Sequence, residues 1–344
     1  MPPITVMIKP ASGICNMRCR YCFYADEQQN REVASYGLMR EDVLRAVLGR
    51  VLAYAEGRCT IAFQGGEPTC AGLPFFRRVV ELEEELNINH VAIDNAIQTN
   101  GYVIDDEWAA FLAQHHFLVG VSLDGPRELH DANRLDAKGS GTHGRVMKAI
   151  ATLKKHGAEF NILTVDTSAT CRSIRKTYGF FKRNGFAYQQ YIPCLDPLGE
   201  ERGGHDYSLS CAAFGQYLKD LFDCWYDDAA HGNLTYNRYF TNLLLLMTGR
   251  PPEACGMLGQ CGRQYVVEAD GSVYPCDFYM LDQWRLGSFV TDTVEDIDKR
   301  REALGFIQMS VEVNEGCRGC KWYPLCRGGC RRDREPMVDG QLQK

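Results

Sequence analysis

Three cysteines lie close together near the amino terminus, at Cys15, Cys19 and Cys22. Their C-x3-C-x2-C spacing places three thiols in one short loop, where three thiolates can share one metal centre. Structural zinc sites take four protein ligands, and a bacterial ferredoxin run carries four cysteines, so this loop is an incomplete version of either. An incomplete ligand set leaves a coordination position open for chemistry. The alternative reading is three unrelated thiols in a loop.

A second group of seven cysteines lies near the carboxyl terminus: Cys255, Cys261, Cys276, Cys317, Cys320, Cys326 and Cys330. So many thiols in so short a segment indicate bound metal, because a small module has little apolar core of its own. Two structural zinc ions would also explain the CxxC pair. The remaining cysteines are expected to be mostly buried, small apolar residues: Cys59, Cys70, Cys171, Cys194, Cys211 and Cys224.

The composition is that of a soluble globular protein of 344 residues, with 45% hydrophobic and 24% charged residues. A formal net charge of −6 argues against a general surface for nucleic acid or anionic membranes. No apolar run reaches the roughly 18 residues of a spanning helix, and the start Met1-Pro2-Pro3-Ile4 has no signal-peptide pattern. We therefore expect a cytoplasmic protein without nucleic-acid or membrane partners.

Short β-rich runs alternate with helical patterns over the first 196 residues. The expected strands are residues 4–10, 59–64, 91–98, 117–123, 159–165 and 187–193. The expected helices between them are residues 41–55, 73–86, 105–114, 144–156 and 172–184. This alternation predicts parallel βαβ units, and six strands favour a partial or complete barrel over a doubly wound sheet.

The unusual residues follow the carboxyl ends of these strands, which is where the chemistry of a β/α barrel lies. The cysteine loop follows the first strand, Gly65-Gly66-Glu67-Pro68 follows the second and Thr99-Asn100-Gly101 the third. Ser122 and Asp124 end the fourth strand, at alternate positions that place both side chains on one side. Gln64 and Tyr24 are weaker candidates for substrate contact at the same mouth.

With an aromatic residue before its last cysteine, the C-x3-C-x2-C loop resembles the radical SAM superfamily. That resemblance implies a partial (β/α)6 TIM-like barrel in which Cys15, Cys19 and Cys22 hold a [4Fe-4S] cluster that binds S-adenosylmethionine (SAM). The Gly-Gly-Glu run matches the element that meets the methionine amino group. The SAM contacts that the resemblance implies are Tyr21, Gly66, Ser122, Arg134 and Leu195.

The cysteine-rich tail resembles the SPASM extension of radical SAM proteins, which holds two auxiliary [4Fe-4S] clusters. By this resemblance the first has the ligands Cys255, Cys261, Cys276 and Cys330, and the second Cys317, Cys320 and Cys326. Two fully protein-bound clusters need eight ligands, and the sequence supplies seven. A truncated chain, or an open or foreign ligand on the second cluster, would each account for this.

After Leu195 the βα alternation stops, and helices are expected over residues 212–230 and 236–247. A hairpin with its turn at Asp270-Gly271 follows in the cysteine-rich tail. The predicted domains are a radical SAM partial barrel over residues 1–196, a helical linker region over 197–250 and a SPASM domain over 251–344.

Tyr274-Pro275-Cys276-Asp277-Phe278-Tyr279 resembles the corresponding run of the anaerobic sulfatase-maturating enzymes, as do residues 9–12, 22–24 and 63–68. The resemblance implies oxidation of a Cys or Ser in a target sulfatase to Cα-formylglycine, started by a 5′-deoxyadenosyl radical from SAM, with Asp277 as the proton acceptor. It also implies three [4Fe-4S] clusters and an electron donor such as a flavodoxin or ferredoxin. Two alternatives stay open: a SPASM maturase that crosslinks a ribosomal peptide, and a non-enzymatic iron–sulfur electron carrier or zinc-stabilised binding module.

Overall fold

The computed structural model describes residues 3–313, 315–334, 337–338 and 341–342. Contacts divide the chain into two compact units. Unit 1 comprises Met1–Ser122, Arg134–Phe160 and Arg263–Leu304, and unit 2 comprises Leu123–Asn133, Asn161–Gly262 and Gly305–Lys344. These units cut the chain differently from the three domains expected from the sequence, and that domain division stays a prediction. The first two residues of the chain, residue 314 and six of the last ten residues lie outside the described residues.

Unit 1 is built on seven strands in the order β12-β11-β10-β1-β3-β4-β5. Their bounds are β1 Ile4–Ile8, β3 Arg58–Phe63, β4 Ala92–Thr99, β5 Leu118–Ser122, β10 Tyr265–Val267, β11 Ser272–Tyr274 and β12 Gly287–Ser288. The pairs β1–β3, β3–β4 and β4–β5 are parallel, as the βαβ alternation predicts. The expected hairpin is confirmed by the antiparallel pair β10–β11.

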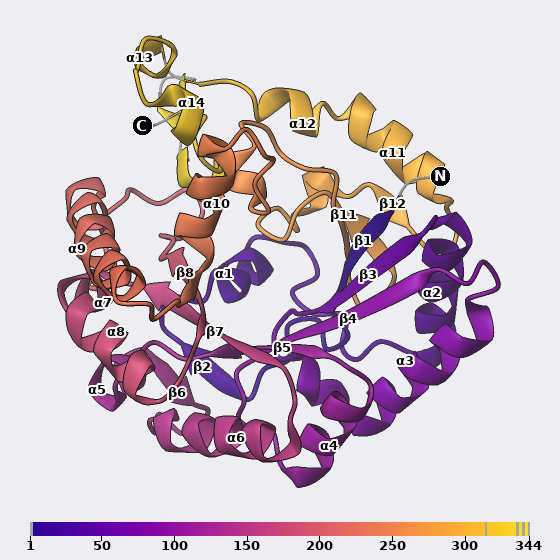
Figure 1. The fold of residues 1–344 in the computed structure, drawn as a ribbon. Coiled ribbons are helices and arrows are strands. Elements are labelled where there is room, and N and C mark those ends of the chain that lie inside the picture. The colour runs from indigo at the N-terminus through magenta and orange to yellow at the C-terminus, as the bar shows by residue number, and fades with distance from the viewer. Residues whose placement is uncertain (1–2, 314, 335–336, 339–340, 343–344) are drawn as a thin grey trace. The chain divides into compact units, whose positions relative to one another are not determined.

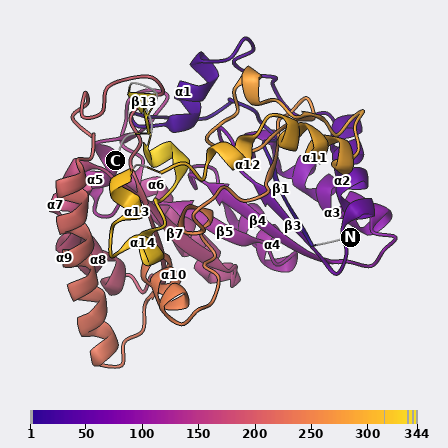
Figure 2. The ribbon, with the colours of Figure 1, turned by 90° about the horizontal axis from the view of Figure 1, so that it is seen from above.

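In Figure 1 the longer helices of unit 1 lie outside its strands: α2 Glu41–Tyr54, α3 Leu73–Leu86, α4 Asp106–Gln114, α6 His143–His156 and α11 Val294–Ala303. The short helix α1, Phe23–Gln29, directly follows the cysteine loop. In α2 the buried residues recur at three- and four-residue spacing, which gives the helix one apolar face for the sheet. Figure 2 shows α11 beside α2.

An aromatic cluster fills the space between this sheet and its helices. Phe63 of β3 contacts Phe76 of α3 with ring centroids 5.1 Å apart, and Phe76 contacts Trp108 of α4 at 5.3 Å. Both phenylalanines are buried. Edge-to-face ring contacts of this kind stabilise a core beyond the area that they bury, so the sheet gives the loops at its end a rigid base.

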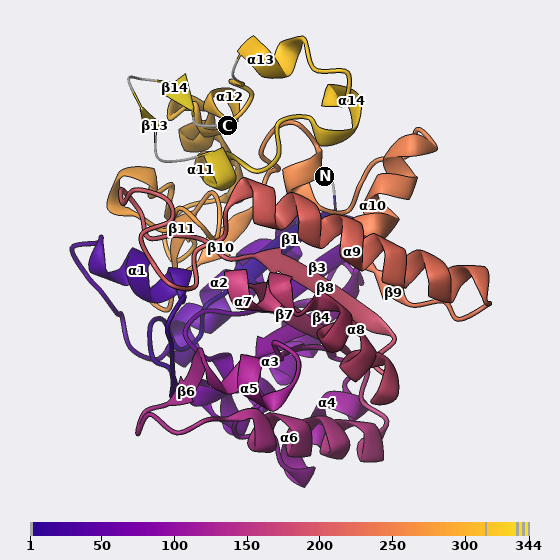
Figure 3. The same ribbon diagram turned by 90° about the vertical axis from the view of Figure 1, so that its left-hand side faces the viewer.

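In unit 2, the parallel strands β7 (Phe160–Asp166), β8 (Tyr188–Pro193) and β9 (Tyr236–Asn237) lie side by side. The helices are α5 Arg127–Asp131, α7 Ser168–Arg172, α8 Ile174–Arg183, α9 Cys211–Ala230, α10 Arg238–Met247, α12 Phe306–Met309, α13 Glu315–Arg318 and α14 Tyr323–Cys326. A short pair, β13 Met337–Val338 and β14 Gln341–Leu342, ends the chain. Figure 3 shows α8 and α9 over one face of β7 and β8.

The expected fold is confirmed, since each of the six predicted parallel strands is present within two residues of its expected bounds. In the described part of the chain the sheet of neither unit closes into a complete barrel. The helix expected over residues 172–184 is confirmed as α8, whereas the short helix α7 that precedes it was not predicted. Among the described residues, no helix has the length and hydrophobicity needed to cross a membrane.

Candidate active site

The cysteine loop is held by a small sheet that the sequence did not predict. β2 (Met17–Cys19) pairs with β6 (Arg134–Asp136) in antiparallel register, so that Cys19 lies opposite Arg134. The guanidinium carbon of Arg134 lies 5.4 Å from the centroid of the Tyr21 ring, within the range of a cation–π contact. Both side chains are buried. Two predicted SAM contacts are therefore brought together beside a predicted cluster ligand.

The three loop thiols are close enough to influence one another. Burial, aided by the charges of Glu67, Cys19 and Cys22, raises the pKa of the Cys15 thiol to about 12, although a hydrogen bond from the Met17 amide lowers it. A free thiol there would stay protonated at neutral pH, so the site favours a thiolate only when iron is bound to it. All three are free of disulfides. This donor set fits the [4Fe-4S] cluster that the sequence predicts.

The described residues contain no group of three His, Cys, Asp or Glu side chains arranged around a single metal ion. Cysteines that hold an iron–sulfur cluster bind different iron atoms, so their sulfur atoms do not need to converge on one point.

Gly66 lies directly against the segment that leads into the cysteine loop. Its amide donates to the Ser12 carbonyl at 2.8 Å, and the next amide, of Glu67, donates to the Ile14 carbonyl at 2.8 Å. A Cβ atom on Gly66 would lie 2.3 Å from that carbonyl oxygen. Only glycine fits this approach, so Gly66 positions the backbone in front of Cys15.

Glu67 ties the ends of β3 and β4 together. Its carboxylate is fully buried and accepts four hydrogen bonds, from the Thr69 amide and hydroxyl, the Thr99 hydroxyl and the Asn100 amide. The Asn100 side chain in turn donates to Asn16 at 2.8 Å, within the cysteine loop. The acidic residue of the Gly-Gly-Glu run thus holds protein groups in place, a structural role that the sequence reading did not separate from ligand binding.

Ser122 ends β5, and its hydroxyl accepts a hydrogen bond from Gln98 of β4 at 3.1 Å. Asp124, which the sequence pairs with it, lies in unit 2, where its carboxylate accepts from the Val165 amide at 3.0 Å. The remaining predicted SAM contact, Leu195, also lies in unit 2, directly after β8.

Asp277 lies in unit 1 and is held by two side chains from the start of the chain. Lys9, the first residue after β1, forms an ion pair with its Oδ1 atom, and the amide of Gln64 donates to its Oδ2 atom at 3.0 Å. The Lys9 side chain is fully buried and that of Asp277 is 12% exposed. In the sequence, Lys9 belongs to the run of residues 9–12 that resembles the family, and nothing in that run indicates its pairing with Asp277.

A second buried ion pair lies next to the first. Glu268 accepts hydrogen bonds at 2.8 Å from Tyr24 and from Arg31, and all three side chains are buried. Tyr24, a weak candidate for substrate contact, therefore uses its hydroxyl within the protein. Its ring face carries the Lys9 ammonium, 3.9 Å from the ring centroid.

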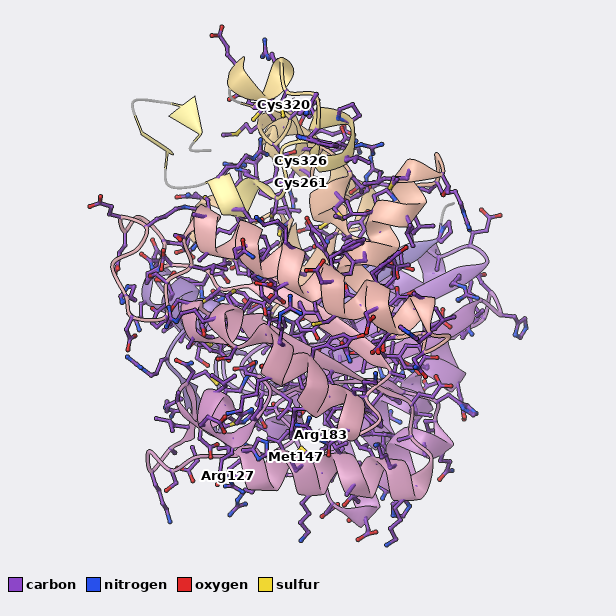
Figure 4. The ribbon with its side chains drawn as sticks, turned by 60° about the vertical axis from the view of Figure 1, so that its left-hand side comes forward. Arg127, Met147, Arg183, Cys261, Cys320 and Cys326 are labelled. Atoms are coloured by element: carbon purple, nitrogen blue, oxygen red, sulfur yellow. The ribbon has the colours of Figure 1, made fainter. Side chains whose placement is uncertain are left out.

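In unit 2, burial raises the pKa of Cys330 to about 12, and the charges of Cys255 and Cys261 contribute to this rise. Cys317, Cys320 and Cys326 lie on or beside the short helices α13 and α14, with Cys320 and Cys326 exposed. Figure 4 labels Cys261, Cys320 and Cys326. The other predicted ligand, Cys276, lies in unit 1 beside Asp277.

Of the six scattered cysteines, only Cys59 and Cys171 are buried. Cys70, Cys194 and Cys224 are partly exposed and Cys211 is exposed. The expectation that most of these thiols fill apolar core is therefore wrong. Several lie at helix or loop positions, where the sequence did not show whether the side chain points to the core or to solvent.

Two family descriptions match the chain: the radical SAM superfamily over residues 10–170, and an iron–sulfur cluster-binding domain, SPASM, over residues 255–321. A cysteine-type anaerobic sulfatase-maturating enzyme of Clostridium perfringens is 48% identical over 343 residues, covering 100% of this chain and 93% of that protein. A serine-type enzyme of Bacteroides thetaiotaomicron is 28% identical, covering 98% and 85%.

The fold agrees with that of a solved relative. The structure described as native anSMEcpe with bound AdoMet and Kp18Cys peptide superposes with a TM-score of 0.95 at 48% identity. The match covers 99% of this chain and 93% of that one. The chain belongs to the anaerobic sulfatase-maturating enzymes, a family of the radical SAM superfamily with a SPASM domain.

Proposed function

We propose that this protein oxidises a cysteine of a sulfatase polypeptide to Cα-formylglycine, using SAM and iron–sulfur clusters. The observation that carries the proposal is 48% identity to a cysteine-type maturating enzyme over the whole chain, against 28% to a serine-type enzyme. The proposal includes a cytoplasmic location and a flavodoxin or ferredoxin as the electron donor.

Cys15, Cys19 and Cys22 are the proposed ligands of the catalytic [4Fe-4S] cluster. Tyr21, Gly66, Ser122, Arg134 and Leu195 are the proposed SAM contacts. Arg134 is a buried cation opposite Cys19, a position that suits the carboxylate of methionine. When bound, SAM and the clusters would supply two things: a 5′-deoxyadenosyl radical, which removes one hydrogen atom, and an acceptor for one electron.

Asp277 is the proposed proton acceptor. The substrate cysteine loses a hydrogen atom from Cβ, the thiol proton and one electron, and the resulting thioaldehyde is hydrolysed to the aldehyde and hydrogen sulfide. Oδ1 of Asp277 accepts from Lys9, and among the described residues Oδ2 accepts one bond, from Gln64. A carboxylate oxygen has two lone pairs, so Oδ2 has room for the thiol proton.

The tail cysteines are the proposed ligands of two auxiliary clusters. Cys255, Cys261, Cys276 and Cys330 would hold the first, and Cys317, Cys320 and Cys326 the second. The electrostatic effect of Cys255 on Cys261, and of both on Cys330, supports a shared site for these three.

Mass spectrometry of a sulfatase peptide after anaerobic incubation with the reconstituted enzyme, SAM and reductant tests the function. We expect the cysteine peptide to lose the mass difference between a thiol side chain and an aldehyde, and to do so faster than its serine counterpart. A loss of two hydrogens alone would indicate a crosslink and would contradict the proposal, as would zinc-bound protein without SAM cleavage.

The variant Asp277→Asn tests the proposed base. We expect it to cleave SAM and to form formylglycine about 10²-fold or more slowly, since a positioned base contributes at least that much. Asp42→Asn makes the same change at an exposed position of unit 1 and should leave the product rate unchanged. An unchanged product rate in Asp277→Asn would remove this residue from the mechanism.

A further inference from the structure

Lys9 is a fully buried cation that the proposed reaction does not use. Its backbone amide donates to the Val267 carbonyl at 2.8 Å, which fixes the start of the side chain between β1 and β10. A buried ammonium group without compensation is strongly unfavourable. The groups that surround Lys9 therefore show what it is there to hold.

The path of the Lys9 side chain is narrow. Gly65 has φ of +129°, and a Cβ built on it would lie 3.1 Å from Cβ and 3.3 Å from Cγ of Lys9. At the far end the ammonium lies over the Tyr24 ring, 3.9 Å from its centroid, and forms the ion pair with Asp277 Oδ1. The Lys9 side chain is thus held between Gly65 and the Tyr24 ring, with its ammonium group on one oxygen of Asp277.

The ring that carries the ammonium is itself fixed. Tyr24 donates its hydroxyl to Glu268 at 2.8 Å, and Glu268 is paired with Arg31 at 2.8 Å. The side chains of Arg31 and Glu268 are fully buried, so this pair cannot exchange partners with solvent. Ring, ammonium and carboxylate therefore form a connected series of contacts that ends on Asp277.

We propose that Lys9 is a positioning residue for the oxidation: it holds Asp277 by Oδ1 so that Oδ2 faces the substrate thiol. Lys9 keeps its proton throughout. The thiol proton moves to Oδ2, and Lys9 acts only by fixing the carboxylate plane together with Gln64. The inference rests on the proposed function, because it assigns a role relative to the proposed base.

One consequence concerns the interpretation of variants at Asp277. Removing its charge breaks the ion pair of the buried Lys9 ammonium, which keeps the Tyr24 ring and the nearby buried carboxyl of Glu27 as neighbours. Loss of product in Asp277→Asn therefore combines loss of the base with disruption around a buried cation that has lost its ion pair. Removing Lys9 in the same protein separates the two effects.

The test compares wild type, Lys9→Met, Asp277→Asn and the double variant in the reconstituted enzyme with a cysteine-containing sulfatase peptide. Methionine keeps much of the length and apolar character of the lysine stem. In Lys9→Met we expect formylglycine formed per 5′-deoxyadenosine to fall at least tenfold, while 5′-deoxyadenosine formation and peptide Kd stay within about twofold of wild type. The double variant should yield no less product than Asp277→Asn, since both changes act on one group.

Lys148→Met is the matched control, because Lys148 is exposed on α6, and we expect wild-type coupling from it. A crystal structure of Lys9→Met supplies a readout independent of turnover: the Asp277 carboxylate should lose its 3.0 Å contact with Gln64. Retained contact, coupling within twofold of wild type, or equal loss of 5′-deoxyadenosine and product would each overturn the inference. A wild-type enzyme that makes no formylglycine would instead refute the proposed function, and the crystal structure would still test the placement of Asp277.

Discussion

Glu67→Gln is the most direct test of how the protein supports its cysteine loop. The Glu67 carboxylate is fully buried, with three donors on Oε1 and the Asn100 amide on Oε2 at 2.7 Å. A glutamine keeps the shape, but its amide nitrogen must face either the single donor or the three donors. Facing the Asn100 amide is the smaller loss, so we take this orientation for the magnitude.

In that orientation one hydrogen bond to a charged group is lost, which costs about 1.5–3 kcal/mol, and one buried amide is left unsatisfied, at about 1–3 kcal/mol. We therefore expect Glu67→Gln to lower the free energy of unfolding by about 2.5–6 kcal/mol. Asn100 also donates to Asn16 in the cysteine loop, so iron content and SAM binding should fall with stability.

Anaerobic urea denaturation of wild type, Glu67→Gln and Glu302→Gln measures this difference. Glu302 is an exposed residue of α11, and its replacement should change the free energy of unfolding by less than about 0.5 kcal/mol. A Glu67→Gln protein as stable as the Glu302→Gln control, with wild-type iron content, would refute the proposed network around Glu67.

Two further predictions concern Gly66 and Glu83. Gly66→Ala places a Cβ 2.3 Å from the Ile14 carbonyl oxygen, so we expect the free energy of unfolding to fall by about 1–3 kcal/mol. Equilibrium dialysis should show weaker SAM binding by this variant. In the control Gly49→Ala the new Cβ meets nothing within 4 Å, so this variant should bind SAM as wild type does. Burial raises the pKa of Glu83 to about 7 from 4.5, so its protonated form stabilises the fold fully below about pH 4.5, and this contribution is lost as pH rises through about 7. Glu83→Gln should therefore be more stable than wild type at pH 8 by up to about 3 kcal/mol and similar to it at pH 4.5, and parallel pH profiles of the two proteins would contradict this.

The sequence predicted the parallel strands well because each is a short β-rich run bounded by turn residues and followed by an amphipathic helix. Leu73–Leu86 has the expected bounds of its helix, and the hairpin at Asp270-Gly271 is where the turn signal places it. The sheet β2–β6 was missed because each strand has three residues, too few for any periodic pattern. The helix α7 was missed because its five residues are too few to show a helical period.

The functional assignment depended on local strings whose chemistry is set by spacing along the chain. C-x3-C-x2-C, Gly-Gly-Glu and the run around Asp277 are contiguous, so the cysteines, Gly66 and Asp277 could be proposed as site residues from the sequence alone. Pairing between distant residues has no such signature. Lys9 and Asp277 are 268 positions apart, and Tyr24 and Glu268 are 244 apart.

The sequence by itself thus determined the family resemblance and the residues proposed to bind iron and SAM, because residue type and spacing are local properties. Only the tertiary structure decided which side chains hold those residues in place. β10 joins the edge of the sheet beside β1, which brings residues near Cys276 against the first residues of the chain. In that arrangement a buried lysine needs a counter-charge, and the fold supplies Asp277 to meet it.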